Sequence, residues 1–398
     1  MKIGMMVDLY KPHISGVTNY VELNKRFLEG EGHEVFVFTF GNENLPDDEL
    51  NIIHTPGLPF KDTGLQFNLT YNKHARRLLY MMDVVHVHHP FLSGTLALRY
   101  CRPRDIPIIF TNHTRYDLYA QVYLPMLPEV IGEAAMKTYL PPFCRACDMV
   151  ISPSQGMAEV LQRFGVDSEI TVIPNGVELE RFFAPAIPVE RAELGFPENC
   201  VVLAYIGRIA AEKNLAFLLR AFNGVAEAYL NVYLLIVGSG PELENIQDQA
   251  TNLNQGNHVH FTGFIPYDQI PRYLAVADAF VTASISEVHP LSVIEAMAAG
   301  LPVLGIVSPG IEDTIEDSHT GFLASNDLAA FTAKMARMVT EHKLRKRMGQ
   351  NAHEASKIYD IRLTSEIMLG HYERLALAAL KHRRGLHYRV LRLMDKWR

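Results

Sequence analysis

The sequence predicts an α/β protein with two doubly wound domains that face each other across a cleft. Each half of the chain alternates short runs of β-branched residues with helical patterns, which is typical of parallel βαβ units. A proline-rich stretch at 182–199 interrupts this alternation and reads as a linker. The length of 398 residues also exceeds the size of a domain with a single hydrophobic core. Ligands of such sheets bind outside the carboxyl ends of the strands, so the site is expected in the cleft.

The elements follow in the order that this fold requires. The first half has expected strands at 2–7, 34–40, 83–88, 107–113 and 148–154, and expected helices at 19–32 and 71–82. The second half has expected strands at 201–207, 232–240, 258–263, 279–284 and 302–307. Its expected helices lie at 214–229, 268–277 and 291–300.

Composition and charge exclude several classes of protein. A net charge of −7 gives no basic footprint for a nucleic acid. No run reaches the ~18 apolar residues of a membrane span, and Asp8 comes too early for the core of a signal peptide. The four cysteines suit a reducing compartment. These observations predict a cytoplasmic protein without a nucleic-acid partner.

Cys144 and Cys147 form a lone C-x-x-C. A zinc or redox role needs a second ligand pair or a thioredoxin-like setting, and neither is visible in the sequence. We interpret them as two core-facing thiols one helical turn apart.

Two cations follow the first strand of the second half. That strand ends at Gly207-Arg208, and Lys213 lies in the same loop. An Arg fork and a Lys point charge suit a diphosphate. The alternative is a solvated surface loop before a helix.

Two glutamates lie in the otherwise apolar stretch 284–303. Glu287 is expected on a loop, and Glu295 about one turn into a helix that starts near Leu291. The free N–H groups at that helix start favour a phosphate, and Pro290 suits a position that needs no donor. Both carboxylates are expected to bind the hydroxyls of a sugar or ribose. Alternatively, either caps a helix or pairs with a nearby Arg.

The first half contributes a glycine and several histidines. Gly16 is expected in the turn after the first strand, and His113 at the cleft edge after a later strand. A structural role for His113 is the alternative. His86, His88 and His89 cluster on one strand, but no carboxylate cluster or Asp-x-Asp pair accompanies them, so no metal site is predicted.

With these residues laid out, the sequence resembles the family-four retaining glycosyltransferases of GT-B architecture, which have two Rossmann-like domains. The resemblance covers nearly the whole chain, and the motifs occur in family order. They are "GHEVFVF", "VIPNGVELERF", "GRIAAEKN", "VGSGPE", "FTGFIP" and "SEVHPLSVIEAMAAGLPV". Two segments, "VHHPFLSG" and "TNHTRYDLYAQVYLP", look most like the branch that glycosylates diacylglycerol or related lipids.

The resemblance implies a role for each matched residue. Arg208 and Lys213 would bind the diphosphate of the donor, Glu287 and His113 the sugar, and Glu295 the ribose. The remaining donor contacts would come from Gly16, Gly238, Phe264, Ile265, Pro290, Leu291 and Ser292. Two positions depart from the family pattern: Ser15 precedes Gly16 where a second glycine is common, and His289-Pro290 stands where Phe-Gly is frequent.

The implied reaction moves a hexose from a nucleotide-sugar, with UDP-glucose first and GDP-mannose second, to a hydroxyl of a membrane lipid such as diacylglycerol. It needs neither a metal nor a cofactor. Residues 1–183, completed by a C-terminal helix at 372–398, would bind the acceptor, and residues 184–371 the donor. The alternatives are a soluble or polysaccharide acceptor, a sugar-nucleotide epimerase and a non-catalytic binding protein.

The C-terminus predicts peripheral attachment to a membrane. Residues 381–398 hold seven Lys or Arg against one Asp, in a chain that is negative overall. An apolar stripe (Leu386, Val390, Leu393, Met394 and Trp397) lies beside a basic row (Arg389, Arg392 and Lys396). We expect this segment to lie on anionic lipid, unless it only packs back on the first domain.

Overall fold

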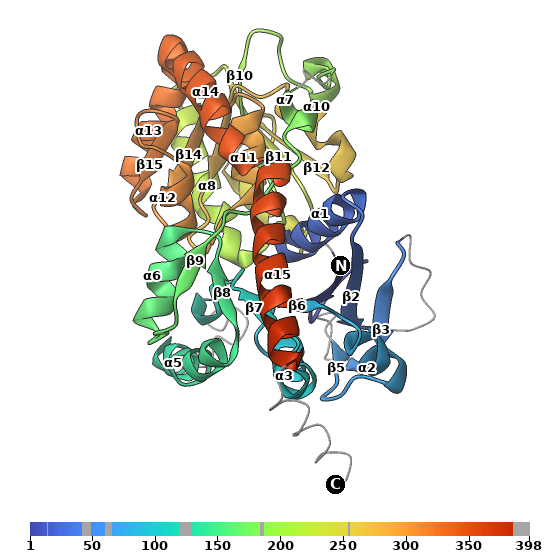
Figure 1. The fold of residues 1–398 in the computed structure, drawn as a ribbon. Helices are drawn as coiled ribbons and strands as arrows, with labels where there is room; N and C mark the ends of the chain where they lie inside the picture. The colour runs from blue at the N-terminus through green and yellow to red at the C-terminus, as the bar shows by residue number, and fades with distance from the viewer. Residues whose placement is uncertain are drawn as a thin grey trace.

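Two parallel sheets form the frame of the molecule (Figure 1). The computed structural model describes residues 1–13, 15–41, 49–59, 66–118, 129–183, 187–253 and 255–384. Within them the strand order is β3-β2-β1-β6-β7-β8-β9 in the first sheet and β12-β11-β10-β13-β14-β15 in the second. All neighbouring strands in both sheets are parallel, so the predicted doubly wound α/β fold is confirmed.

The first sheet draws its strands from the first half of the chain. They are β1 (Lys2–Met6), β2 (Glu34–Phe40), β3 (Ile52–Thr55), β6 (Val84–Val87), β7 (Ile108–Thr111), β8 (Met149–Ser152) and β9 (Ile170–Val172). The associated helices are α1 (Gly16–Gly30), α2 (Lys73–Leu79), α3 (Leu92–Tyr100), α5 (Glu129–Ala146) and α6 (Gln155–Arg163). A small antiparallel pair, β4 (Leu58–Pro59) and β5 (Gln66–Phe67), lies apart from the sheet.

The second sheet follows a short helix, α7 (Glu180–Phe183). Its strands are β10 (Val201–Ile206), β11 (Val232–Val237), β12 (Val259–Gly263), β13 (Ala279–Thr282), β14 (Val303–Ile306) and β15 (Gly321–Ala324). Its helices are α8 (Leu215–Ala226), α9 (Leu243–Asn252), α10 (Ile270–Leu274), α11 (Leu291–Ala298), α12 (Pro309–Thr314), α13 (Leu328–Thr340) and α14 (His342–Ser356).

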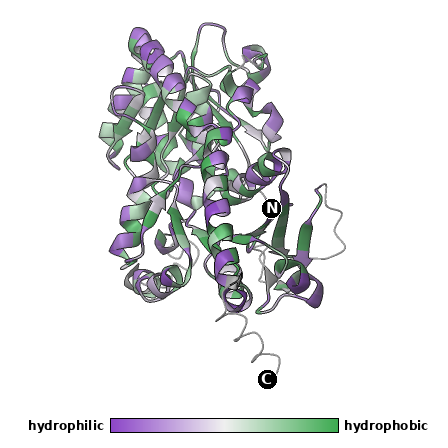
Figure 2. Cartoon of the chain, in the orientation of Figure 1, coloured by the Kyte–Doolittle hydropathy of each residue, from purple (hydrophilic) through white to green (hydrophobic). Residues whose placement is uncertain are grey.

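The strands are apolar because helices cover both faces of each sheet. In β2 every residue from Val35 to Phe40 is buried, which is the pattern of a strand without a solvated face. Figure 2 shows the same division, with hydrophobic strands inside and hydrophilic turns on the outer helices. Cys144 is buried in α5 and Cys147 follows that helix; both are free thiols, as expected, and burial raises the pKa of Cys144 to about 12.

The last helix, α15 (Ile361–Arg384), returns from the second domain to the first (Figure 1). It begins at Ile361 rather than at 372, because Asp360 Oδ1 accepts the amide of Arg362 (2.8 Å) and caps the helix start. Tyr372 is buried in the core of the first domain, and its hydroxyl lies 2.6 Å from His86 Nδ1. The basic segment 385–398 lies outside the described residues.

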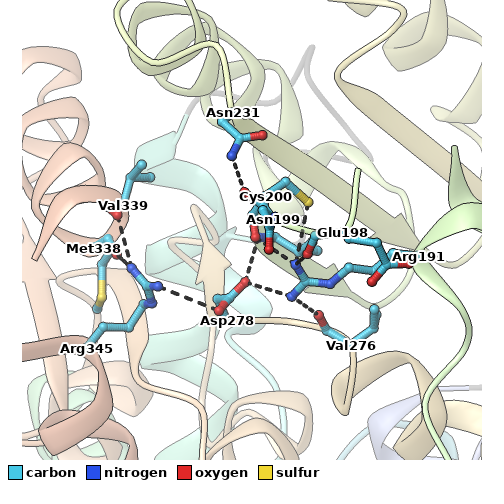
Figure 3. A network of polar contacts seen from close by, with 11 residues as sticks. Arg191, Glu198, Asn199, Cys200, Asn231, Val276, Asp278, Met338, Val339 and Arg345 are labelled. Atoms are coloured by element: carbon cyan, nitrogen blue, oxygen red, sulfur yellow. Dashed lines mark hydrogen bonds and ion pairs between the residues drawn. The ribbon is translucent and has the colours of Figure 1, made fainter. Parts of the chain in front are cut away.

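The buried guanidinium of Arg345 lies beside Asp278, the residue just before β13. Asp278 in turn contacts the start of β10 and the segment that precedes it (Figure 3). Arg345 is 7% exposed, donates to the carbonyls of Met338 and Val339, and lies 3.6 Å from Asp278 Oδ1. Asp278 Oδ2 accepts the amide of Val202 (2.9 Å) and pairs with Arg191 (3.3 Å). One carboxylate therefore serves two cations and the start of β10.

We expect Asp278→Ala to lower the free energy of unfolding by about 2 to 3 kcal/mol, because it leaves a buried guanidinium without its counter-charge. Urea denaturation followed by circular dichroism measures this loss. The matched control is Glu341→Gln, which breaks an exposed pair with Arg337 and should change little. Equal effects of the two substitutions would contradict the role of Asp278.

Candidate functional site

The predicted cations and carboxylates meet where the second sheet reverses its strand order. Strands β10 and β13 are neighbours in space, although β11 and β12 separate them in the chain. The connections after two such strands run to opposite faces and leave a crevice at their carboxyl ends. Arg208 and Lys213 follow β10, and Glu287 follows β13. The topology therefore brings together the two loops that carry these three residues.

Lys213 and Glu287 form an ion pair. The distance from Lys213 Nζ to Glu287 Oε1 is 2.7 Å, and the two side chains are only 21% and 16% exposed. From the sequence, Lys213 was expected at the diphosphate and Glu287 at the sugar. In the structure the two side chains are in direct contact.

Backbone contacts fix the two loops relative to each other. Lys213 ends a short 3-10 helix (Ala211–Lys213), and Asn214 follows in the left-handed region with φ +54°. The Asn214 side chain donates to the carbonyl of Ala283 (3.3 Å), just after β13. Ser284 Oγ donates to the carbonyl of Glu212 (3.4 Å).

Gly238 is required by packing at the end of β11. Its φ is +139°, and a Cβ there would lie 1.9 Å from the carbonyl oxygen of Gly207 at the end of β10. No side chain could occupy that position without moving the backbone. Beside it, Phe264 is 60% exposed, whereas Ile265 packs partly buried against the core.

The loop that carries Glu287 runs into helix α11. The carbonyl of Glu287 accepts the amide of Gly310 (3.1 Å), where a Cβ would lie 2.3 Å from the Val288 backbone. Pro290 is the N-cap of α11 rather than a residue of its first turn, and its carbonyl accepts the amide of Ile294. Leu291 and Ser292 are the first two helical residues, and N–H groups at such positions have no partner inside a helix.

His289 stands where the family pattern frequently has Phe, and like a Phe it packs as an aromatic ring in the core. It is 6% exposed and packs edge-on against Tyr359, with ring centroids 5.1 Å apart. Burial lowers the pKa of His289 to about 3, so the ring is neutral. Its carbonyl accepts from Asn175 Nδ2 (3.2 Å), which joins this loop to the segment after the first sheet.

Glu295 has a partner in the protein that the sequence analysis did not identify. Tyr267 donates its hydroxyl to Glu295 Oε1 at 2.9 Å, and the carboxyl is 6% exposed. Burial raises the pKa of Glu295 to about 7, and the bond from Tyr267 opposes this rise. The carboxyl therefore exchanges a proton near neutral pH, and it can both donate to and accept from a hydroxyl.

The first sheet has a reversal of its own, between β1 and β6. Asp8, after β1, accepts the amide and hydroxyl of Ser93 and so caps α3, while its own amide donates to His89 Nδ1 (3.2 Å). Gly16 is the first residue of α1 rather than part of a turn. Ser15 stands where a second glycine is common because its Oγ caps this helix at the amide of Thr18.

The loops of the two domains approach each other through His13 and Arg208. Burial lowers the pKa of His13, and the positive charge of Arg208 lowers it further. His13 follows β1 and Arg208 follows β10, so the carboxyl ends of the two sheets meet here. The sequence analysis missed His13 and Tyr267. His13 precedes the helix of Gly16, which was a signal; nothing in the sequence near Tyr267 indicated its contact with Glu295.

His113 lies at the carboxyl end of β7, in contact with residues from two other elements. Its Nε2 is 3.1 Å from His88 Nδ1, and Tyr20 packs against its ring with centroids 4.7 Å apart. His86 bonds instead to Tyr372 and to Thr111 Oγ1 (2.7 Å). In the part of the chain that the structure describes, no group of His, Cys, Asp or Glu side chains is arranged to hold a metal ion.

The "VHHPFLSG" segment is explained in part by helix packing. A Cβ on Gly94 would lie 2.8 Å from the ring of Phe143, so α3 can approach α5 closely only with a glycine there. Phe91 packs edge-on against Tyr116 and stacks on Tyr139, with centroids 5.0 and 5.5 Å apart. Part of the second segment, residues 119–125, lies outside the described residues.

The raised pKa of Glu295 predicts a pH dependence of stability. Between pH 4.5 and about 7 the native state binds more protons than the unfolded state, so stability falls as pH rises through this window. Glu295→Gln stays neutral and should remove up to roughly 3 kcal/mol of this fall. Melting temperatures at pH 5 and pH 8 measure it, and parallel profiles for the two proteins would refute the raised pKa. Tyr267→Phe should shift the fall to higher pH.

The chain matches known proteins over most of its length. A model described as Glycosyltransferase Family 4 matches residues 14–181, and one described as Glycosyl transferases group 1 matches residues 186–355. The alpha-monoglucosyldiacylglycerol synthase of Streptococcus pneumoniae is 33% identical over 83% of this chain and 77% of its own. The protein of the same name from Acholeplasma laidlawii is 29% identical over 81% of this chain and 84% of its own.

A solved structure shows the same architecture. The sucrose-phosphate synthase of Thermosynechococcus elongatus superposes with a TM-score of 0.77 at 22% identity, covering 95% of this chain and 99% of its own. That likeness supports the fold, and the family models and relatives support the chemistry. The chain belongs to the retaining family-four glycosyltransferases, with two Rossmann-like domains in the GT-B arrangement.

Proposed function

We propose that this glycosyltransferase moves glucose from UDP-glucose to a hydroxyl of a membrane lipid such as diacylglycerol, with retention at the anomeric carbon. The observation that carries the proposal is the similarity, over most of the chain, to two proteins named alpha-monoglucosyldiacylglycerol synthase. The geometry of the site supports the donor half of the reaction, and a surface groove supports the acceptor half.

Arg208 and Lys213 bind the diphosphate of the donor in this proposal. Negative charge grows on the diphosphate as the bond to the sugar breaks, and it is stabilised by the partly buried Lys213, which Glu287 holds in place, and by the exposed Arg208. The amides of Leu291 and Ser292, at the start of α11, add donors and the positive end of the helix dipole. The leaving phosphate then takes the proton of the incoming hydroxyl on the same face of the sugar.

Glu287 and His113 contact the sugar from opposite domains, and Glu295 contacts the ribose. Glu287 is held in place by Lys213, so a cation that meets the phosphate also orients a carboxylate next to it. Phe264 offers an exposed ring, and with Ile265 it lies in the loop proposed to receive the base. Gly16, where a Cβ would meet nothing within 4 Å, leaves room for the donor, and Gly238 contacts the donor through its backbone.

The reaction is proposed to need no metal. Two cations already face the proposed diphosphate position, and a divalent ion there would lie against Arg208 and Lys213 and be repelled by them. The first shell of a magnesium-diphosphate usually comes from carboxylates, and the sequence has no Asp-x-Asp pair to supply them.

An apolar groove between α3 and α5 supports a lipid acceptor. Its volume is about 820 Å³, and its lining is mostly apolar, including Leu98, Ala135, Tyr139 and Phe143. The Tyr139 hydroxyl donates to the carbonyl of Pro90 (2.7 Å), beside His89. This bond links one residue of the groove lining to the loop after β6, the side from which we propose that the acceptor hydroxyl arrives.

Membrane attachment is proposed on the sequence alone. The stripe from Leu386 to Trp397 lies outside the described residues, and the described chain ends at Arg384, near the ion pair of His382 with Asp105 (3.7 Å). No helix among the described residues is long and apolar enough to cross a bilayer.

Transfer of labelled sugar decides between the candidate substrates. We expect product with UDP-glucose and diacylglycerol in anionic mixed micelles, in the presence of EDTA, and an α-linkage by NMR. GDP-mannose should react at least 10-fold more slowly, because a ~1.4 kcal/mol loss of transition-state binding is tenfold. Transfer to a soluble sugar at the lipid rate would refute the acceptor, and donor turnover without any acceptor would indicate an epimerase.

Arg208→Ala and Lys213→Ala should each lower kcat by roughly 10²-fold, if each residue supplies ~3 kcal/mol to the transition state. Because Lys213 and Glu287 are paired, Lys213→Ala and Glu287→Gln should be non-additive in a double-mutant cycle. Lys357→Ala, at an exposed ion pair, is the control and should keep the wild-type rate. Near-normal rates in both site variants would refute this diphosphate site.

A further inference from the structure

His88 lies buried directly behind His113. Strands β6 and β7 are parallel neighbours, and the two histidines follow their carboxyl ends. His88 Nδ1 is 3.1 Å from His113 Nε2, and the two rings are stacked with centroids 5.3 Å apart. The His88 side chain is fully buried, whereas His113 is partly exposed. His88 therefore reaches the site only through His113.

The bond between these imidazoles contains one hydrogen. Burial lowers the pKa of both rings well below the usual range, and the neighbouring histidines lower it further. Both rings are therefore neutral near pH 7, and each carries a single proton on one of its two nitrogens. Either His88 Nδ1 donates to His113, or His113 Nε2 donates to His88.

The other nitrogen of His88 decides between these arrangements. His88 Nε2 is buried and has no hydrogen-bond partner among the described residues. If His113 were the donor, the single proton of His88 would sit on Nε2 as a buried N–H without an acceptor. Orphaned buried N–H groups are rarer than under-used acceptors. His88 is therefore protonated at Nδ1 and donates to His113 Nε2.

His113 is left with its own proton on Nδ1. Within the described ranges no protein group bonds to this nitrogen, and it is not among the buried unpartnered atoms. Tyr20 packs against both rings, with centroids 5.6 Å from His88 and 4.7 Å from His113, and so restricts their rotation. The partly exposed ring thus presents an N–H group.

We propose that His88 is a positioning residue: it holds His113 in the Nδ1–H tautomer and makes it a hydrogen-bond donor to an oxygen of the donor sugar. The identity of that oxygen rests on the proposed function. The tautomer does not, because it follows from the contacts and the burial of the two histidines.

Long-range ¹H–¹⁵N correlation spectra of the full chain, labelled with ¹⁵N-histidine, read the tautomer without any substrate. His113→Asn identifies the His113 signals. We expect them to show a protonated Nδ1 and an unprotonated Nε2 between pH 6.5 and 8. A protonated Nε2 in the wild-type protein would overturn the proposal, whatever the enzyme's substrates prove to be.

Two substitutions of similar size test the link to turnover. In His88→Asn the amide nitrogen is bonded to Cγ, as Nδ1 is, and can still donate to His113; His88→Leu cannot. We expect His88→Leu to lose the tautomer and lower kcat by about tenfold to a hundredfold, the loss expected for one hydrogen bond, with little change in KM for the acceptor. His88→Asn should restore most of the rate.

His86→Asn is the matched control, since His86 is equally buried, two residues before His88 and within β6, but bonds to Tyr372 and Thr111 instead. It should lower the melting temperature and leave the His113 tautomer unchanged; only small shifts of the signals are expected, because the His86 ring lies 4.2 Å from that of His88. Wild-type kcat in a folded His88→Leu variant would overturn the proposal. If that variant does not fold, an Nδ1–H signal retained in His88→Asn supports the proposal, and its loss there contradicts it.

Discussion

The reversal of strand order in each parallel sheet is the constraint on which the site depends. Where the order reverses, two adjacent strands send their connections to opposite faces, and their carboxyl ends are left open. In the second sheet this happens between β10 and β13, and in the first between β1 and β6. Lys213 and Glu287 are 74 positions apart in the chain, yet they form a 2.7 Å pair because their strands are neighbours.

Charge is distributed around this point in a way that suits a diphosphate. Glu287 has a cation beside it, whereas the described bond to Glu295 comes from a neutral phenol, Tyr267. A buried carboxyl without a counter-charge gains a proton more readily, which is why the pKa of Glu295 rises to about 7. A protonated Glu295 therefore adds no negative charge to a site in which Lys213 is already paired with Glu287.

The first domain contributes neutral polar groups instead of charges. Burial keeps His86, His88 and His113 neutral, so each ring carries one proton. Their hydrogen bonds therefore depend on which nitrogen holds that proton rather than on titration. The contact of His86 with Tyr372 also joins this cluster to α15, the helix that returns from the second domain. The contact between His86 and Tyr372 therefore holds the three histidines of the first domain against the last helix of the chain.

The sequence by itself determined the fold class, and it singled out the residues that we propose for the donor site. Apolar runs such as Val201–Ile206 alternate with helical patterns, and periodicity is a local property that can be read along the chain. Four charged residues could be singled out because a charge at a strand end or in an apolar stretch needs a partner or a ligand to stabilise it. They are Arg208, Lys213, Glu287 and Glu295. Only the tertiary structure decided who their partners are. These partners come from segments that are distant in the chain, and no local pattern records such contacts. Examples are Tyr267 beside Glu295, His13 near Arg208 and His88 behind His113.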